Sequence, residues 1–97
     1  MAYKIITNFE ANQDIINSFE YYKKVAGKKV ADQFFKDFKL SVSKLKKVTY
    51  YQKIYSDFHR LPLAVFPFII IYKIEKEKQI IKIFRVFHTS QNPEKYP

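Results

Sequence analysis

Arginine and histidine follow one another closely where the most apolar part of this chain ends. Residues 66–93 read FPFIIIYKIEKEKQIIKIFRVFHTSQNP, and Arg85 and His88 lie just before a polar tail. An imidazole has an unperturbed pKa near neutrality, so His88 is a candidate general acid or base. Residues separated by an odd number face opposite sides of a regular strand. Arg85 and His88 therefore converge on one site only if the strand ends or bulges between them.

Each of these residues also has a purely structural explanation. For Arg60, further back along the chain, it is an ion pair with Asp57 or with an acid on a helix. For Arg85 the structural explanation is that it forms hydrogen bonds with polar groups at the end of a sheet. For His88 it is that the side chain caps the edge of a strand. Polar groups at sheet ends mark functional sites only statistically, so both explanations stand at this point.

The charge of the chain favours an anionic partner. Eighteen Lys and Arg against nine Asp and Glu give a formal net charge of +9. Such a surplus is typical of proteins that bind nucleic acid, a nucleoprotein or an acidic protein segment. The alternative is a solvated, lysine-rich surface without a specific partner.

Several classes of protein are excluded by composition. The chain has no Cys, two His and one Gly, which excludes a disulfide scaffold and cysteine-bound zinc and argues against a glycine-rich phosphate loop. We therefore predict no metal and no cofactor. No apolar run is long enough to span a membrane, and the N-terminus does not read as a secretory signal. The sequence predicts a cytoplasmic protein with no membrane partner.

Two amphipathic helices are expected to form an antiparallel hairpin around Gly27. Asn8 is suited to capping the first helix and Gly27 to ending it. The apolar stripe of the first helix comprises Ala11, Ile15, Phe19, Tyr22 and Ala26. The second helix is expected from about Lys29 to Val48, with Leu40 on its polar face. Leu40 is either an ordinary surface residue or a partner contact.

Four strands complete the prediction. They are Ala2–Thr7, a short edge piece within Asp57–Pro67 that Pro62 limits, Phe68–Ile74 and Gln79–Phe87, with a loop over residues 49–57. Residues 1–97 are thus expected to form one α+β domain in the order β-α-α-β-β-β. The domain is a two-helix antiparallel hairpin packed on a mainly antiparallel four-stranded sheet.

The last two strands are apolar on both faces. Strict alternation places Ile81, Ile83 and Phe87 on one face and Ile80, Phe84 and Val86 on the other. The helical hairpin can cover one face. The other face needs either the segment 49–67 or another chain, because an exposed apolar sheet face is an interaction site.

Three groups of residues occur in a recognisable order along the chain. They are Asp14-Ile15-Ile16 with Tyr21-Tyr22, then Arg60-Leu61-Pro62-Leu63 with Phe66-Pro67-Phe68 and Tyr72, and finally Arg85-Val86-Phe87-His88 with Asn92-Pro93. In this order the chain resembles the RelE/ParE superfamily of type II toxin–antitoxin toxins over nearly its whole length. RelE-like members cut mRNA on the ribosome, whereas ParE-like members poison DNA gyrase, so the fold alone does not decide the target.

The resemblance to RelE-like members implies a metal-independent ribonuclease site. A base draws the 2′-hydroxyl onto the phosphate, cations stabilise the transition state and an acid assists the leaving oxygen. Arg60 and Arg85 match basic residues that such members use, and His88 would be the acid or base. Supporting or binding roles are implied for Lys53, His59 and the C-terminal aromatic residue Tyr96.

The tail departs from the ribonuclease pattern. Many members carry arginines after the histidine, where this chain has Thr89, Ser90 and Gln91. The pattern of Phe66-Pro67-Phe68, and of His88 with Pro93, is closer to ParE-like members. The leading hypothesis is therefore a gyrase-poisoning toxin, with a ribosome-dependent endoribonuclease and an inactive antitoxin-binding module as alternatives. All three imply a cognate antitoxin with an acidic, partly disordered segment, in a hetero-oligomer.

Overall fold

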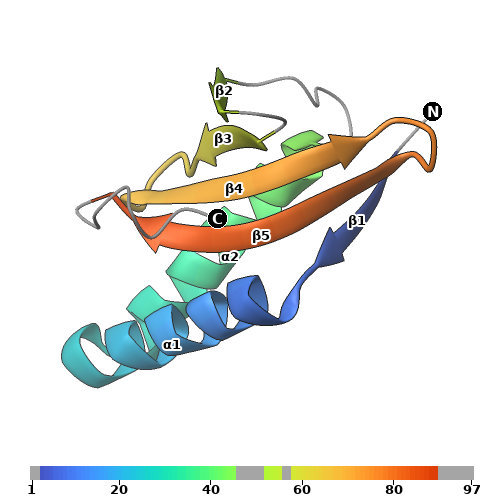
Figure 1. The fold of residues 1–97 in the computed structure, drawn as a ribbon. Helices are drawn as coiled ribbons and strands as arrows, with labels where there is room; N and C mark the ends of the chain where they lie inside the picture. The colour runs from blue at the N-terminus through green and yellow to red at the C-terminus, as the bar shows by residue number, and fades with distance from the viewer. Residues whose placement is uncertain (1–2, 46–51, 56–57, 90–97) are drawn as a thin grey trace.

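Two helices packed on one side of a five-stranded sheet make up this protein (Figure 1). The structure is a computed structural model, and it describes residues 3–45, 52–55 and 58–89, with only the backbone for 52–55. The elements along the chain are β1 Lys4–Thr7, α1 Phe9–Ala26, α2 Lys28–Leu45, β2 Gln52–Tyr55, β3 Phe58–Pro62, β4 Phe68–Glu75 and β5 Ile80–His88.

The strand order across the sheet is β1-β5-β4-β3-β2. β1 runs parallel to β5, and the remaining pairs are antiparallel. The parallel pairing places the start of the chain beside its last hairpin (Figure 1). The predicted α+β arrangement, a helical hairpin on a mainly antiparallel sheet, is confirmed.

One short strand was expected to be loop. Gln52–Tyr55 pairs with β3 from Gln52 opposite Arg60 to Tyr55 opposite Phe58, with an irregularity between Lys53 and Tyr55. This piece is only four residues long and lacks clear apolar alternation, so its own sequence does not reveal it. The expectation of a short strand limited by Pro62 is confirmed, because β3 has five residues and ends at Pro62.

Local signals set the ends of α1. The Asn8 side-chain oxygen accepts a hydrogen bond from the backbone N–H of Ala11 at 2.9 Å, as a helix N-cap does. Gly27 follows α1 with φ of 97°, a conformation that strains a residue carrying a Cβ. α2 then begins at Lys28, so the two helices are joined by one residue. The predicted end of the second helix, at Val48, lies outside the described residues.

A β-bulge in β5 changes which side chains face the helices. Ile71 pairs with Arg85 but Tyr72 pairs with Ile83, which leaves Phe84 as an extra residue. The predicted alternation of side chains between the two faces of this strand is therefore wrong beyond Phe84. Val86 joins the helix-facing core with Ile81 and Ile83, whereas Phe87 lies on the opposite face.

The main core fills the space between the sheet and the helical hairpin. Its buried side chains come from both helices and from β3, β4 and β5, and include Phe34, Leu45, Tyr72 and Ile83. A smaller cluster of Ile69, Ile71 and Phe87 occupies the other face, with Phe58 packed against it. Within the described residues, neither helix is long and apolar enough to cross a membrane.

Candidate functional site

Arg60 and Arg85 lie in one row across the sheet. Arg60 on β3 is opposite Ile71 on β4, and Ile71 is opposite Arg85 on β5. Directly opposed residues of neighbouring strands share a face, so both arginines lie on the face that carries Ile71, away from the main core. Two strand spacings separate their backbones, about 10 Å. We call the face that carries Arg60, Ile71 and Arg85 the outer sheet face.

The Arg85 guanidinium is held by a carboxylate of α1. Its Nε and Nη2 donate to the two oxygens of Asp14 at 2.8 and 3.0 Å, which makes a bidentate pair. The same hydrogen bonds raise the pKa of Arg85 further above its already high value. The guanidinium carbon also lies 4.6 Å from the centre of the Phe87 ring. Much of the charge of Arg85 is therefore balanced within the protein.

Asp14 also closes a gap in the sheet. β1 pairs with β5 only as far as Thr7 opposite Ile83, so the edge of β5 is open beyond that point. One Asp14 oxygen accepts the backbone N–H of Val86 at 2.9 Å. The carboxylate thus replaces a missing strand at this edge and positions Arg85 at the same time.

Arg60 is in a different environment. It is half-buried, and its Nε is enclosed without a hydrogen-bond partner among the residues that the structure describes. The structural explanation by an ion pair with Asp57 lies outside the described residues. A buried N–H without a partner is costly, and an anion from outside would satisfy it.

The two histidines lie on the other face of the sheet. His59 is opposite Tyr72, and their rings stack at 5.4 Å with an angle of 20° between the planes. His88 is opposite Phe68, and its ring meets the Phe68 ring edge-on at 5.2 Å. Tyr72 and Phe68 both belong to the main core. Neither histidine shares a face with the two arginines.

The bulge does not bring Arg85 and His88 together, because it lies at Phe84 and not between them. Among the described residues, the outer sheet face therefore gathers cations without a histidine. His59 also does not support Arg60 from the same face, although the two are adjacent in sequence.

The remaining predicted residues are spread over the molecule. Lys53 is in β2 opposite His59, and only its backbone is described. Leu40 is 56% exposed on α2, as its position in the helical pattern predicts. Tyr96 lies outside the described residues.

Two acids with structural roles were not predicted as site residues, although Asp14 belongs to the residues that carry the family resemblance. Asp14 holds Arg85, and the Asp37 carboxylate accepts the backbone N–H groups of Val65 and Phe66 at 3.0 and 2.8 Å. Both acids lie three residues after a buried position of their helix, Ala11 or Phe34. An acid so close to an apolar stripe is the signal that could have identified them.

The outer sheet face alternates cations with aromatic rings. The Lys73 ammonium lies 6.0 Å from the centre of the Phe58 ring, and the Lys82 ammonium lies 5.2 Å from that of Phe84. The Phe58 and Phe84 rings meet edge-on at 5.0 Å. This surface is suited to an anionic partner with planar groups or to an acidic protein surface.

Comparison with known proteins decides the family. A family model described as the ParE toxin of the type II toxin–antitoxin system parDE matches residues 5–93. This chain belongs to the ParE toxin family. It is a type II toxin–antitoxin toxin of the ParE/RelE superfamily, as the sequence resemblance implies. No functionally curated protein matches the chain.

Solved structures agree with this assignment at the level of the fold. A structure described as the chromosomal ParDE toxin–antitoxin system from P. aeruginosa has a TM-score of 0.80 at 17% identity, covering 92% of this chain and 98% of that one. The isolated E. coli RelE toxin has a TM-score of 0.56 at 14% identity, covering 96% and 90%. The M. tuberculosis RelBE2 complex has a TM-score of 0.59 at 13% identity, covering 91% and 99%.

Proposed function

We propose that this ParE-family toxin arrests growth by binding and poisoning DNA gyrase, and that a cognate antitoxin neutralises it. The observation that carries this proposal is the separation of the arginines on the outer sheet face from the described histidines. Arg85 is paired with Asp14, and the described histidines lie on the opposite face. Phosphoryl transfer by a metal-independent route needs free cations and an acid or base at one place. A poison that acts by binding needs neither.

The fold comparison supports the same choice. The ParDE system from P. aeruginosa matches this chain with a higher TM-score than the RelE structures described above. The antitoxin partner is supported by the E. coli RelBE complex, which matches at a TM-score of 0.55 and 14% identity and covers 93% of this chain and all of that one.

The test uses purified gyrase, supercoiled plasmid, ATP and the purified chain. The expected result is accumulation of linear plasmid once the trapped cleavage complex is denatured. Adding the cognate antitoxin should abolish it. If the plasmid is supercoiled and relaxed normally at concentrations of the chain that arrest growth, gyrase is not the target.

A ribosome-dependent endoribonuclease is the second candidate, because Arg60 and Arg85 do share a face. It predicts cleavage of mRNA on purified ribosomes, with loss of cleavage in Arg60→Ala and Arg85→Ala. Lys4→Ala is the matched control, because it removes an exposed cation opposite Ile80, at the other end of β5 from Arg85. Cleavage that survives both arginine substitutions would exclude this candidate.

A further inference from the structure

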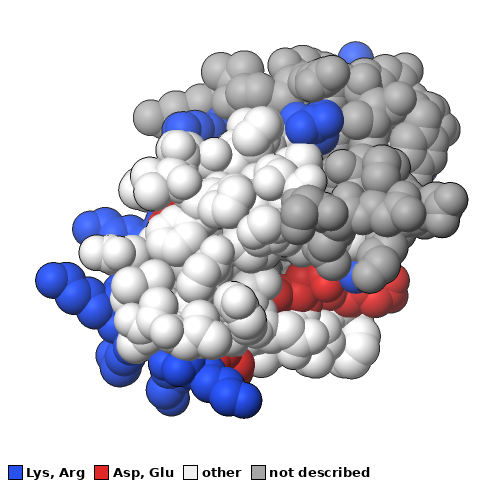
Figure 2. Space-filling model, turned by 90° about the vertical axis from the view of Figure 1, so that its left-hand side faces the viewer, with Lys and Arg blue, Asp and Glu red and all other residues white. Residues whose placement is uncertain are grey.

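Four lysines and no acid occupy the closed end of the helical hairpin. Residues 23–29 read KKVAGKK and comprise the end of α1, the connecting glycine and the start of α2. All seven of these residues are exposed. Figure 2 views the molecule from the side on which this end of the hairpin lies, and shows lysine and arginine side chains gathered there. We call residues 23–29 the hairpin tip.

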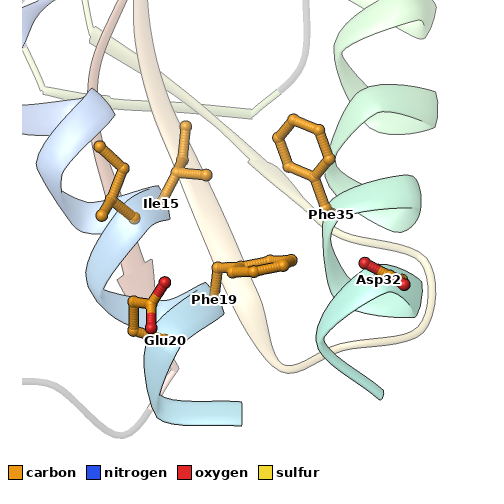
Figure 3. A pocket seen from close by; sticks show the side chains of 6 residues that line it. Ile15, Phe19, Glu20, Asp32 and Phe35 are labelled. Carbon is orange, nitrogen blue, oxygen red and sulfur yellow. The ribbon is translucent and has the colours of Figure 1, made fainter. Parts of the chain in front are cut away.

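The acids nearest to the hairpin tip neutralise only part of its charge. Asp32 accepts a hydrogen bond from the Lys28 ammonium at 3.1 Å. Glu20, like Asp32, lines the apolar hollow between the two helices and lies outside the tip (Figure 3). The other three lysines of the tip make no ion pair within the described part of the chain. The tip is therefore a positive surface separate from that hollow.

The lysines at the other end of the molecule are arranged differently. Residues 75–78, at the turn between β4 and β5, alternate glutamate with lysine and so carry no formal net charge. This turn lies far from the hairpin tip, at the opposite end of the fold (Figure 1). Solubility alone requires a net charge but does not require that lysines and acids be segregated. The concentration of lysine at the tip therefore favours a specific anionic partner over simple solvation.

Two of the four lysines lie where a cation destabilises a helix. Lys28 and Lys29 are in the first turn of α2, which has no acidic residue. The partial positive charge at the start of a helix repels cations there. The ion pair with Asp32 offsets this repulsion for Lys28, but Lys29 has no ion pair among the residues that the structure describes. Helix stability does not explain Lys29, whereas contact with an anionic partner does.

The type of charge and the shape of the tip select a phosphate backbone. Lysine ammonium groups contact phosphates as point charges, without the fixed geometry by which arginine reads a base edge. The axes of packed helices are about 8–10 Å apart, so lysines from both helices can reach phosphates on either side of a DNA minor groove, which is about 6 Å wide. Val25 is the only apolar side chain larger than alanine in the tip, which is too little for insertion into a lipid surface.

We propose that the hairpin tip binds the phosphate backbone of duplex DNA without reading its sequence. The choice of DNA rests on the proposed function, because gyrase holds a DNA duplex and a toxin bound to gyrase lies beside it. The tip lysines then anchor the toxin to this DNA, in addition to its contact with the enzyme.

The first experiment measures DNA binding in the absence of gyrase. A short fluorescein-labelled DNA duplex is titrated with the purified full chain at several sodium chloride concentrations, and binding is followed by fluorescence anisotropy. The tip variant combines Lys23→Glu with Lys29→Glu. The matched control combines Lys4→Glu with Lys78→Glu, because these exposed lysines lie near the turn between β4 and β5 and their replacement changes the net charge equally.

The tip variant should bind the duplex about tenfold or more weakly than the unsubstituted chain. The slope of the logarithm of the binding constant against the logarithm of the salt concentration should become shallower by about 2, since each lost phosphate contact removes about 1. The control should change much less in both respects. Equal weakening in the two variants would attribute binding to net charge alone and overturn the proposal, as would a strong preference among duplexes of unrelated sequence.

Two further probes test the choice of partner. Binding of an RNA duplex, or of vesicles that contain anionic lipid, should not exceed binding of DNA. Binding of either probe that depends on the tip, without binding of DNA, would assign the tip to that partner and overturn the proposal.

The fold of the variants is checked by thermal unfolding. Lys29→Glu places an acid in the first turn of α2, so the Tm of this single variant should be unchanged or higher while its affinity for DNA falls. A variant that combines Lys23→Gln with Lys29→Gln repeats the binding measurement with a smaller change in charge and should show a smaller loss. Full binding by this folded variant and by the Glu variant overturns the proposal.

The second experiment separates this inference from the proposed function. In the gyrase assay, about tenfold more of the tip variant than of the unsubstituted chain should be needed for the same amount of linear plasmid. Equal accumulation by both proteins overturns the contribution of the tip at gyrase. If the unsubstituted chain produces no linear plasmid, the proposed function fails, while the anisotropy experiment still decides whether the tip binds DNA.

Discussion

Asp14 serves two groups at the edge of β5, the Arg85 guanidinium and the Val86 backbone N–H. The pair is largely shielded, with 27% of the Arg85 side chain and 16% of the Asp14 side chain exposed. Hydrogen bonds to charged groups in such a setting are stronger than those at an open surface. One carboxylate thus fixes both a strand edge and the direction of a cation.

We expect Asp14→Ala to lower the free energy of unfolding by about 2 kcal/mol, since it leaves a half-buried guanidinium and a strand N–H without their acceptor. Urea unfolding measures this. Asp32→Ala is the control, because the Lys28–Asp32 pair is exposed and should contribute about 0.5 kcal/mol or less. Equal losses in the two variants would show that the Asp14 pair has no special role.

Tyr22 carries the other resolved pKa shift among the described residues. Its ring lies against Phe34, Phe66 and Phe68, and burial, followed by the neighbouring Tyr21, raises the pKa of its phenol. The folded chain then binds the phenolic proton more tightly than the unfolded chain. The resulting stability is fully present below the unfolded pKa, near 10, and is lost as pH rises through the folded value.

Tyr22→Phe should therefore make stability less dependent on pH above about 10 while keeping the ring contacts. Urea unfolding over the alkaline range is the measurement. Tyr21→Phe removes only the smaller cause of the raised Tyr22 pKa, so most of the pH dependence of stability should remain. An unchanged alkaline slope in Tyr22→Phe would show that this phenol does not control it.

At the scale of elements, Asp37 ties α2 to the connection between β3 and β4. Its carboxylate accepts the backbone N–H groups of Val65 and Phe66, and Phe66 in turn packs its ring against Tyr22 and Phe34. The connection is therefore held by a buried acid on one side and by aromatic packing on the other.

Replacing Asp37 by Ala should speed amide hydrogen exchange at Val65 and Phe66 and lower the free energy of unfolding by about 1–3 kcal/mol. Asp37→Asn keeps one acceptor oxygen and should lose less. Exchange that accelerates equally throughout β3 and β4 would instead indicate general destabilisation.

The elements also show what a sequence can reveal. Asn8 and Gly27 act within a few residues of themselves, so their roles in α1 were predictable. The extra strand β2 and the bulge at Phe84 depend on a neighbouring strand, and a strand's own residues do not record that pairing. The bond between Asp14 and Arg85 joins residues 71 positions apart, so the site could be predicted only as separate residues.

At the scale of the whole molecule, net charge opposes folding. A charge of +9 on a chain of 97 residues produces self-repulsion that salt screens. The Arg85–Asp14 pair is partly buried and loses less to screening than exposed charges do. The repulsive contribution should therefore dominate the response to salt.

Raising sodium chloride from low to moderate concentration should increase the Tm by about 2–5 °C, as followed by circular dichroism. Replacing the exposed Lys4, Lys24 and Lys78 by Glu should reduce this increase. A Tm that falls with salt would mean that ion pairs outweigh the repulsion.

The bulge at Phe84 decides which side chains in the last part of β5 face the helices and which face outward. If β5 kept all its residues but paired regularly, without the bulge, Phe84 would be opposite Ile71 and Arg85 opposite Ile70, in the main core. Deleting Phe84 itself would remove the bulge and keep Arg85 opposite Ile71, so the end of the strand would keep its inner and outer side chains. A relative that lacks this residue can therefore keep both the fold and the outer sheet face, so residues here should be aligned by face and not by count.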